Sequence, residues 1–420
     1  MRDIKTESGK LVIDTLNSRP GRLELPYLHY RQPDRVRPTV FFLGGGPGIS
    51  NLGFKPQPEW LRDFDVVVLE YRGVGNSSIL LNSRHFGAGL RKLRGRLSSA
   101  DSEIMKADFA AGFADLRAQG IDFAEFSIDA LADDLERLRH KLQLPAVHLV
   151  AHSFGTRVAL SYQTRHRSSV ASSLLLAMNM PGGFIWQPRQ TDSVVKRYQT
   201  HLTHRAPELA ASLARFLDAP TPRPGSYGPF VLNDAKALFV SFFLTFNTNT
   251  RDFAYKALST ANEGSGGRWL LLDLSYDWFI RFGFNWADFF LKAYIADCDR
   301  DAIQRADADG QSAIFQSPSS VLFAGMDGFE ASGGRCGALS WTPDLRHTLA
   351  INGEFDTTTP LERRPAALNN EQYIVIPGGG HADIFYPNHG QAARWMRSFF
   401  LKPAHRYPPP LSESPIPPAP

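Results

Sequence analysis

The stretch VHLVAHSFGTRVAL, at residues 147–160, decides the fold. Its apolar run breaks into small residues around Ser153 and then resumes with helical spacing. This pattern predicts a strand, a very tight turn and a helix. A serine on such a turn is held above the end of a sheet, and the backbone amides beside it face a helix N-terminus, which stabilises developing negative charge. We therefore interpret the stretch as a nucleophile elbow.

The elbow departs from its usual pattern at one position. Glycine normally stands two residues before and two residues after the serine, because a larger side chain collides in the turn. Those positions hold Ala151 and Gly155 here. Alanine is the smallest substitute for glycine, so the pattern survives, but a small-x-Ser-x-Gly motif is frequent by chance. The interpretation therefore depends on the rest of the chain.

The segments around the elbow predict a mostly parallel sheet flanked by helices. Short continuous apolar runs are typical of strands covered on both faces, and they occur at 38–43, 66–69, 174–177, 347–351 and 372–376. We expect an antiparallel hairpin over 11–14 and 22–30 at a sheet edge. Helices are expected from Ile128, with Ser127 as N-cap, and over 392–400. This order of elements predicts an α/β sheet.

Residues 183–320 have a different character from the rest of the chain. They contain few β-branched runs and many aromatic residues at helical intervals. This predicts a mainly helical cap, inserted into a core formed by 1–182 and 321–402. Most of the aromatic residues are expected to form the core of the cap, and a minority to line a pocket. The proline-rich residues 403–420 are expected to form an extended or disordered tail.

The composition indicates a globular protein that does not bind nucleic acid. The 420 residues carry a formal net charge of +4, with 43% hydrophobic and 21% charged residues. One basic cluster, RKLRGR at 91–96, is interpreted as solvated surface because no aromatic residues interleave with it. Two cysteines, Cys298 and Cys336, provide neither a disulfide framework nor metal-ligand spacing. A reduced compartment is the simpler expectation, with a single bridge as the alternative.

No apolar run approaches the ~18 residues that a membrane span needs, and the N-terminal residues have no apolar core of a signal peptide. We therefore expect a cytoplasmic protein without a membrane partner, with a secreted mature form as the alternative. No cofactor and no metal ion are expected.

The chain downstream of the elbow supplies the acid and the base that an elbow serine needs. A serine hydroxyl becomes nucleophilic when a base removes its proton, and a third group must orient that base. Asp356 follows the strand expected at 347–351, and His381 follows the strand expected at 372–376. Both positions are at the carboxyl ends of their strands, where the elbow also places Ser153. The chain order Ser, Asp, His is that of the α/β-hydrolases.

Other acidic and histidine residues are weaker candidates for the same roles. Glu354 is the alternative acid. Asp383 and His389 are expected to be surface loop residues, and His148 a packed core histidine.

The glycine run GGGPG at 44–48 is assigned to an oxyanion hole. A dinucleotide-binding fingerprint that starts at Gly44 would need glycine in place of Ile49, and Pro47 would interrupt the phosphate-binding helix start. Backbone amides of a loop without side chains can instead approach a substrate carbonyl oxygen. Gly45 is the first choice of donor and Gly46 the second, joined by the amide of Phe154.

Several of these motifs resemble those of the proline iminopeptidase family of serine peptidases, and most closely its tripeptidyl aminopeptidase branch. The glycine run, the motif EYRGVGNS at 70–77, the elbow, the acid loop at 353–360 and the histidine loop at 380–381 occur in the order of that family. Gly44, Glu70 and Ala151 replace the family's histidine, aspartate and first elbow glycine. The resemblance implies an α/β-hydrolase fold and an exopeptidase that removes residues from peptide N-termini.

In that family, acidic cap residues hold the free amino group of the substrate. Asp273, Asp277 and Asp288 are candidates here only because they are acidic and lie within an aromatic-rich cap, and we expect them on the surface.

The sequence therefore predicts a serine hydrolase with Ser153 as nucleophile, His381 as base and Asp356 as orienting acid. The substrate is expected to be a peptide or a small ester. A carboxylic ester or lactone hydrolase is the main alternative, because the triad itself implies only acyl transfer. A binding protein of the same fold that lacks activity is a third possibility.

Overall fold

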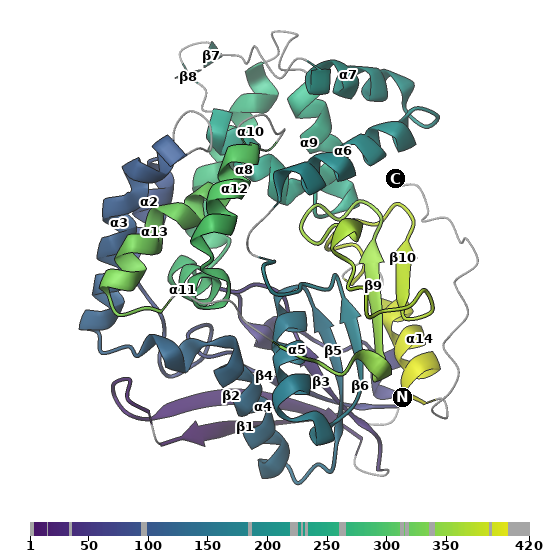
Figure 1. The fold of residues 1–420 in the computed structure, drawn as a ribbon. Coiled ribbons are helices and arrows are strands. Elements are labelled where there is room, and N and C mark those ends of the chain that lie inside the picture. The colour runs from purple at the N-terminus through teal and green to yellow at the C-terminus, as the bar shows by residue number, and fades with distance from the viewer. Residues whose placement is uncertain are drawn as a thin grey trace.

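An eight-stranded sheet forms the centre of the computed structural model (Figure 1). The structure describes residues 4–14, 16–32, 36–93, 99–183, 187–218, 226–227, 230–231, 234–259, 266–310, 315, 319–335, 341–385 and 389–401. The strands of this sheet are β1 (Lys5–Ile13), β2 (Leu23–Arg31), β3 (Thr39–Leu43), β4 (Asp65–Leu69), β5 (Val147–His152), β6 (Val170–Leu176), β9 (Thr348–Gly353) and β10 (Tyr373–Ile376). A separate short hairpin consists of β7 (Ser226–Tyr227) and β8 (Phe230–Val231).

The strand order is β1-β2-β4-β3-β5-β6-β9-β10. Strands β1 and β2 form an antiparallel hairpin at one edge, and β2 is antiparallel to β4. The remaining neighbours pair in parallel. The predicted edge hairpin and the predicted α/β-hydrolase fold are confirmed. The elbow strand β5 lies between β3 and β6, so the loops that follow β3, β5, β9 and β10 leave the same edge of the sheet.

Alternating side chains of the strands face two separate hydrophobic layers. Phe41, Leu43 and Leu149 belong to one layer, and Val40 and Phe42 to the other. Helices α4 (Ile128–Lys141) and α5 (Phe154–Arg165) lie in the first layer. The second layer is covered by α1 (Pro58–Leu61) and α14 (His389–Phe400). Both faces are therefore buried, which explains why the strands read as continuous apolar runs.

Helix α4 follows the amphipathic pattern that predicted it. The side chain of Ser127 caps the helix by accepting a hydrogen bond of 3.2 Å from the amide of Ala130. Leu131, Leu135 and Leu138 are buried.

A helical layer lies above the carboxyl edge of the sheet (Figure 1). It contains α6 (Pro188–Leu202), α7 (Pro207–Asp218), α8 (Asp234–Leu244), α9 (Thr248–Ser259), α10 (Gly266–Phe282), α11 (Trp286–Asp297) and α12 (Arg300–Gly310). Helix α13 (Ser319–Ala331) packs against α12 and against α3 (Ser99–Ala118), and α3 packs against α2 (Arg84–Arg91). The layer therefore also draws on segments that precede the elbow, for which no element was predicted. The tail at 403–420 lies outside the described residues.

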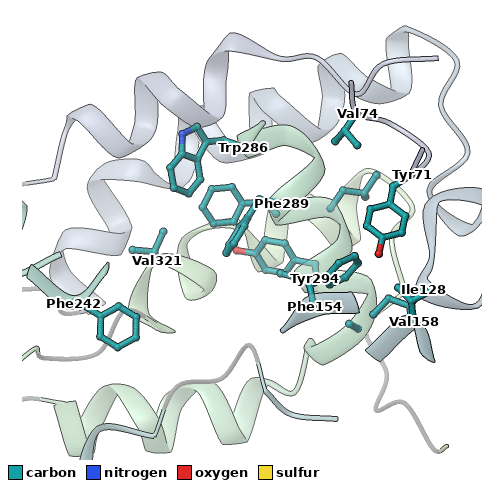
Figure 2. Close-up of a cluster of buried hydrophobic side chains, with 14 of the residues drawn as sticks. Tyr71, Val74, Ile128, Phe154, Val158, Phe242, Trp286, Phe289, Tyr294 and Val321 are labelled. Carbon is teal, nitrogen blue, oxygen red and sulfur yellow. The ribbon is translucent and has the colours of Figure 1, made fainter. Parts of the chain in front are cut away.

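The elbow helix shares one hydrophobic core with the helices α6 to α12 above the sheet, which we call the cap. Figure 2 shows Phe154 from the start of α5 near Phe289 and Tyr294 from α11, and all three belong to the same buried cluster. Phe242 from α8 and Val321 from α13 extend this cluster. The cap is therefore continuous with the layer that supports Ser153.

An ion pair and a disulfide bond hold the C-terminal end of α11. Both terminal nitrogens of Arg157, on the elbow helix, donate to the carboxylate of Asp297 at 2.6 and 2.7 Å. The next residue, Cys298, is disulfide-bonded. The only other cysteine of the sequence, Cys336, lies outside the described residues. Disulfides persist mainly in oxidising compartments, so the cysteines do not support the expected reduced compartment.

Candidate active site

Ser153 occupies a strained turn between β5 and α5. Its φ of 52° and ψ of −119° lie in a region that residues with a side chain rarely adopt. The Ser153 amide donates to the carbonyl oxygen of Leu176 at 2.9 Å, which fixes the turn to the neighbouring strand. A Cβ atom on Gly155 would lie 2.1 Å from the carbonyl oxygen of Leu43. The predicted strand, tight turn and helix are therefore confirmed, and only glycine fits at position 155.

Three predicted residues meet at the carboxyl edge of the sheet. The Oγ atom of Ser153 lies 2.7 Å from Nε2 of His381, and Nδ1 of His381 lies 2.8 Å from Oδ2 of Asp356. All three side chains are buried. If His381 Nδ1 carries the proton and donates it to Asp356, Nε2 is free to accept the Ser153 hydroxyl proton. The arrangement is that of a nucleophile, a base and an orienting acid.

The acid loop holds Asp356 in its charged form. The amides of Thr358 and Thr359 each donate to Oδ1 at 2.8 Å, and the Thr359 hydroxyl donates to Oδ2 at 2.6 Å. Burial by itself would raise the pKa of Asp356, but the attraction of His381 and the hydrogen bonds from Thr359 outweigh burial, so the pKa lies below its ordinary value. A buried carboxylate in this state can hold one tautomer of His381.

Two of the weaker candidates lie away from His381. The carboxylate of Glu354 accepts a hydrogen bond of 2.8 Å from the amide of Gly378. The His148 ring stacks on Phe400, with centroids 4.4 Å apart, which agrees with the predicted core role. The His389 side chain lies outside what the structure describes.

The expectation that Asp383 is a surface residue is wrong. Only 4% of Asp383 is exposed. Its carboxylate accepts a hydrogen bond of 2.8 Å from the amide of Gly380, beside His381, and bonds from the amide and hydroxyl of Thr248 at the start of α9. A carboxylate at a helix N-terminus is favoured by the helix dipole. Asp383 therefore fastens the histidine loop to the cap.

A cap aromatic ring also covers the histidine loop. The Phe246 ring centroid lies 5.0 Å from that of His381, and the Phe246 carbonyl oxygen accepts from the amide of Ala382 at 2.7 Å. Phe246, one of the aromatic residues predicted for the cap, thus reaches the catalytic edge.

The glycine loop after β3 lies against Ser153. A Cβ atom on Gly45 would lie 3.4 Å from the Cβ of Ser153 and 3.2 Å from Nδ1 of His152. The amide of Gly44 donates to Oδ1 of Asn51 at 2.8 Å, so that donor points away from the serine. The placement of Gly45 beside Ser153 agrees with its assignment as an oxyanion donor, which stays a prediction, as do those of Gly46 and Phe154.

His152 connects the elbow to the histidine loop. Because the His381 carbonyl oxygen can only accept, Nε2 of His152, 3.0 Å away, carries a proton. Burial, assisted by the nearby His381, lowers the pKa of His152 to about 4. His152 is therefore neutral at physiological pH and adds no positive charge beside the base.

Cap helix α11 holds the far end of the glycine loop. Oδ2 of Asp288 accepts a hydrogen bond of 2.9 Å from the amide of Gly48, and Oδ1 pairs with Nζ of Lys292 at 2.6 Å. Lys292 Nζ also donates to the carbonyl oxygen of Arg72 at 2.8 Å. The expectation that Asp288 lies on the surface is wrong, because both side chains of the pair are fully buried. Burial raises the pKa of Asp288 and lowers that of Lys292, so each charge depends on its partner.

The other two acidic candidates of the cap lie on α10. Asp277 is exposed and pairs with Lys236 at 3.2 Å. Asp273 is partly buried on the same helix.

The contacts that three residues make around the site were not predicted from the sequence, and a sequence signal existed for one of them. Lys292 stands four residues after Asp288 in an apolar helix, and such spacing indicates a paired charge. Phe246 and Thr248 contact the histidine loop only through the fold, and no local pattern marks them.

The comparisons with known proteins agree with this fold. Residues 38–226 match a family described as the alpha/beta hydrolase fold. The match begins just before β3 and includes the whole elbow. No curated protein has a sequence that matches the chain.

Three solved structures are examples of what this chain is distantly similar to. A thermophilic esterase from Thermogutta terrifontis is 15% identical, with 93% of this chain and 98% of that chain covered and a TM-score of 0.39. A proline iminopeptidase-related protein from Thermus thermophilus is 18% identical, with 93% and 96% covered and a TM-score of 0.39. A 2-hydroxy-6-oxo-6-phenylhexa-2,4-dienoate hydrolase from a Rhodococcus species is 14% identical, with 95% and 100% covered and a TM-score of 0.39. Likenesses this distant carry no argument about activity.

Proposed function

We propose that this chain is a serine hydrolase that works through an acyl-enzyme. The observation that carries the proposal is the chain of two short hydrogen bonds from Ser153 through His381 to Asp356. These residues come from three separate loops that follow β5, β9 and β10 and meet in space.

In this mechanism the Ser153 hydroxyl attacks an acyl carbonyl while His381 Nε2 takes its proton. The imidazolium that forms is stabilised by Asp356. The amides of Gly45 and Phe154 hold the developing oxyanion, and one such donor contributes typically about 10² to 10³ in rate. His381 then protonates the leaving group, and water that it activates releases the acyl group from Ser153.

The more specific form of the proposal is an aminopeptidase that removes residues from peptide N-termini. It is supported by the order and spacing of the glycine run, the motif at 70–77 and the triad loops, which resemble those of the proline iminopeptidase family.

A carboxylic ester hydrolase is the second candidate, and two observations favour it. The cap side chain that packs on His381 is the aromatic ring of Phe246. Asp288, a candidate to bind a substrate's ammonium group, is instead neutralised by Lys292. An apolar acyl group is therefore as compatible with this cap as a peptide.

A substrate panel separates the two candidates. Aminoacyl and tripeptidyl anilides with a free amine are compared with their N-acylated forms and with simple carboxylic esters, in the wild type and in Ser153→Ala. We expect anilide cleavage that needs the free amine and disappears in Ser153→Ala. Ester turnover without any anilide cleavage would replace the peptidase by the esterase. Failure of Ser153 to react with a fluorophosphonate would instead favour a binding protein without activity.

A further inference from the structure

Helix α10 carries a row of large apolar side chains on the outside of the cap. Leu271, Leu274, Trp278 and Phe282 are 55%, 58%, 64% and 60% exposed. Their spacing of three and four residues places them on one helix face, which we call the α10 stripe. The rings of Trp278 and Phe282 lie 5.7 Å apart.

The opposite face of α10 packs against the core, so the helix does not need the stripe to be anchored. Trp269, Leu272, Tyr276 and Ile280 are at most 2% exposed and belong to the main core. A surface helix of a soluble protein normally turns polar residues outward. A contiguous exposed apolar face marks an interaction surface.

Basic residues border the α10 stripe on both sides. At 100° per residue, Arg268 and Arg281 fall on opposite flanks of the stripe, and both are exposed. The Arg281 guanidinium lies 5.1 Å from the ring centroid of Phe282. An exposed apolar face flanked by arginines is a feature that α10 shares with helices that lie in the plane of a membrane surface. The exposed acidic residue of the same helix, Asp277, pairs with Lys236 at 3.2 Å.

Further positive charge adjoins α10 from neighbouring elements. The hydroxyl of Tyr276, on the buried face of α10, donates to the carbonyl oxygen of Leu90 at 2.7 Å, which brings the exposed Arg91 next to this helix. A surface depression of about 830 Å³ is lined by Arg215, Lys256 and Arg268, with Glu208 as its acidic member. The proposed function uses none of these charges.

We infer that the α10 stripe docks on an anionic lipid surface. Leucine, tryptophan and phenylalanine would enter the boundary between headgroups and acyl chains, and Arg268 and Arg281 would contact anionic headgroups. A surface of uniform negative charge complements both arginine flanks at once, which favours lipid over a second copy of this chain, whose flanks carry the same charge.

Docking of this kind does not need a membrane-spanning segment. In the part of the chain that the structure describes, no helix is both long and apolar enough to cross a bilayer. The sequence predicted no membrane partner because it contains no apolar run long enough to span a bilayer. The inference replaces that prediction with contact at the membrane surface.

Ring contacts connect α10 with the aromatic side chain that covers His381. Phe279, on the inner side of α10, contacts Phe243 with ring centroids 4.8 Å apart, and Phe243 contacts Phe246 at 5.2 Å. Phe246 in turn lies on His381. The helix that carries the stripe is thus linked to the catalytic histidine through three ring contacts.

Sedimentation with vesicles tests the inference. The purified full-length chain is mixed with vesicles of pure phosphatidylcholine or of three parts phosphatidylcholine to one part phosphatidylglycerol. We expect binding to the anionic vesicles that weakens at about 0.5 M salt, because screening shortens the reach of the arginines. The Leu274→Ser/Trp278→Ser variant should bind about tenfold more weakly or worse. Loss of Arg268 or Arg281 by substitution with Gln should cost about fivefold each.

Two controls keep the test independent of folding and of activity. Ile104→Ser removes an apolar side chain of α3 that is 48% exposed, and this variant should bind like the wild type. Ser153→Ala should also bind normally, so failure of the proposed function leaves this test intact. Equal binding by all variants, or no binding to anionic vesicles, would overturn the inference. A dimer in light scattering that dissociates in Leu274→Ser/Trp278→Ser would also overturn it, because the stripe would then join two copies.

Discussion

The amide of Gly48 donates a hydrogen bond of 2.9 Å to Oδ2 of Asp288, so a cap residue 240 positions further along the chain holds the glycine loop beside Ser153. A second hydrogen bond joins the same two segments: the Asn285 amide donates to the Gly48 carbonyl oxygen at 2.8 Å. Both backbone polar groups of Gly48, its amide and its carbonyl oxygen, are therefore hydrogen-bonded to the start of α11. The position of Gly45, three residues earlier, depends on a helix that the hydrolase core does not contain.

Replacement of Lys292 by Met should destabilise the protein and slow the reaction. It removes the partner of a fully buried carboxylate, and breaking such a pair costs about 3 to 5 kcal/mol. Urea unfolding and kcat for an activated ester measure the two effects. The double variant Lys292→Met/Asp288→Asn should recover most of the stability, because no charge is then left unpaired.

Lys236→Met is the matched control for Lys292→Met. Lys236 also belongs to the cap and also pairs with an aspartate, but its partner Asp277 is more than half exposed. Exposed pairs contribute about 0 to 1 kcal/mol, so this variant should stay close to the wild type. Similar losses in both lysine variants would contradict a special role of the buried pair.

Asp356→Asn should lower kcat by about 10⁴ with little change in the fold. Asparagine can still accept from the amides of Thr358 and Thr359, but its amide nitrogen would favour the wrong tautomer of His381. Circular dichroism and steady-state kinetics check the two parts. Glu354→Gln is the control, since Glu354 is the alternative acid and bonds to Gly378 instead. A large loss in Glu354→Gln together with an active Asp356→Asn would exchange the two roles.

Gly155→Ala should prevent folding or leave little soluble protein. The new Cβ would lie 2.1 Å from the carbonyl oxygen of Leu43 and 2.6 Å from that of Gly44, and backbone atoms of a central strand cannot move aside. Gly53→Ala is the matched control, because a Cβ there meets nothing within 4 Å. Soluble yield and melting temperature distinguish them, and a Gly155→Ala protein as stable as Gly53→Ala would show that the elbow is packed differently.

The parts of the site that could be predicted from sequence are those fixed by local geometry. Ser153, Asp356 and His381 each follow a short apolar strand, and parallel strands bring their carboxyl ends together, so the order of motifs was sufficient to place them. The sheet was predictable for the same reason, since both faces are covered and each strand reads as an apolar run.

The parts that could not be predicted depend on contacts between distant segments. Asp383 appeared to be a loop residue because its partner, Thr248, is 135 positions away in the cap. Asp288 was expected on the surface, but it is buried with Lys292 because α11 packs on the glycine loop. No local pattern encodes how a cap helix meets the core.

Thiol titration should find no free cysteine before reduction. Cys298 is disulfide-bonded, and the sequence contains two cysteines. The chain purified without reductant and denatured should therefore release no colour from a thiol reagent, and the reduced chain should show two thiols. Two reactive thiols before reduction would mean that the protein is made in the reduced form, as expected in the cytoplasm.

Stability should fall between pH 6.5 and pH 4, and His148 should account for part of that fall. Burial lowers the pKa of His148 from 6.5 to about 4. Above pH 6.5 the imidazole is neutral in both the folded and the unfolded chain. As the pH falls below 6.5, the unfolded chain takes up a proton that the folded chain resists, so the folded state loses relative stability until about pH 4.

His148→Phe should remove this contribution and keep the stacking on Phe400. Relative to the variant, the wild type should lose about 2 kcal/mol between pH 7 and pH 5, and the full difference should approach about 3 kcal/mol near pH 4. The variant should also gain some stability at pH 7, since within the described chain the buried Nδ1 of His148 has no hydrogen-bond partner. Urea unfolding at each pH measures both effects, with the exposed His204→Gln as control. Parallel pH profiles for wild type and His148→Phe would mean that His148 titrates normally in the folded protein.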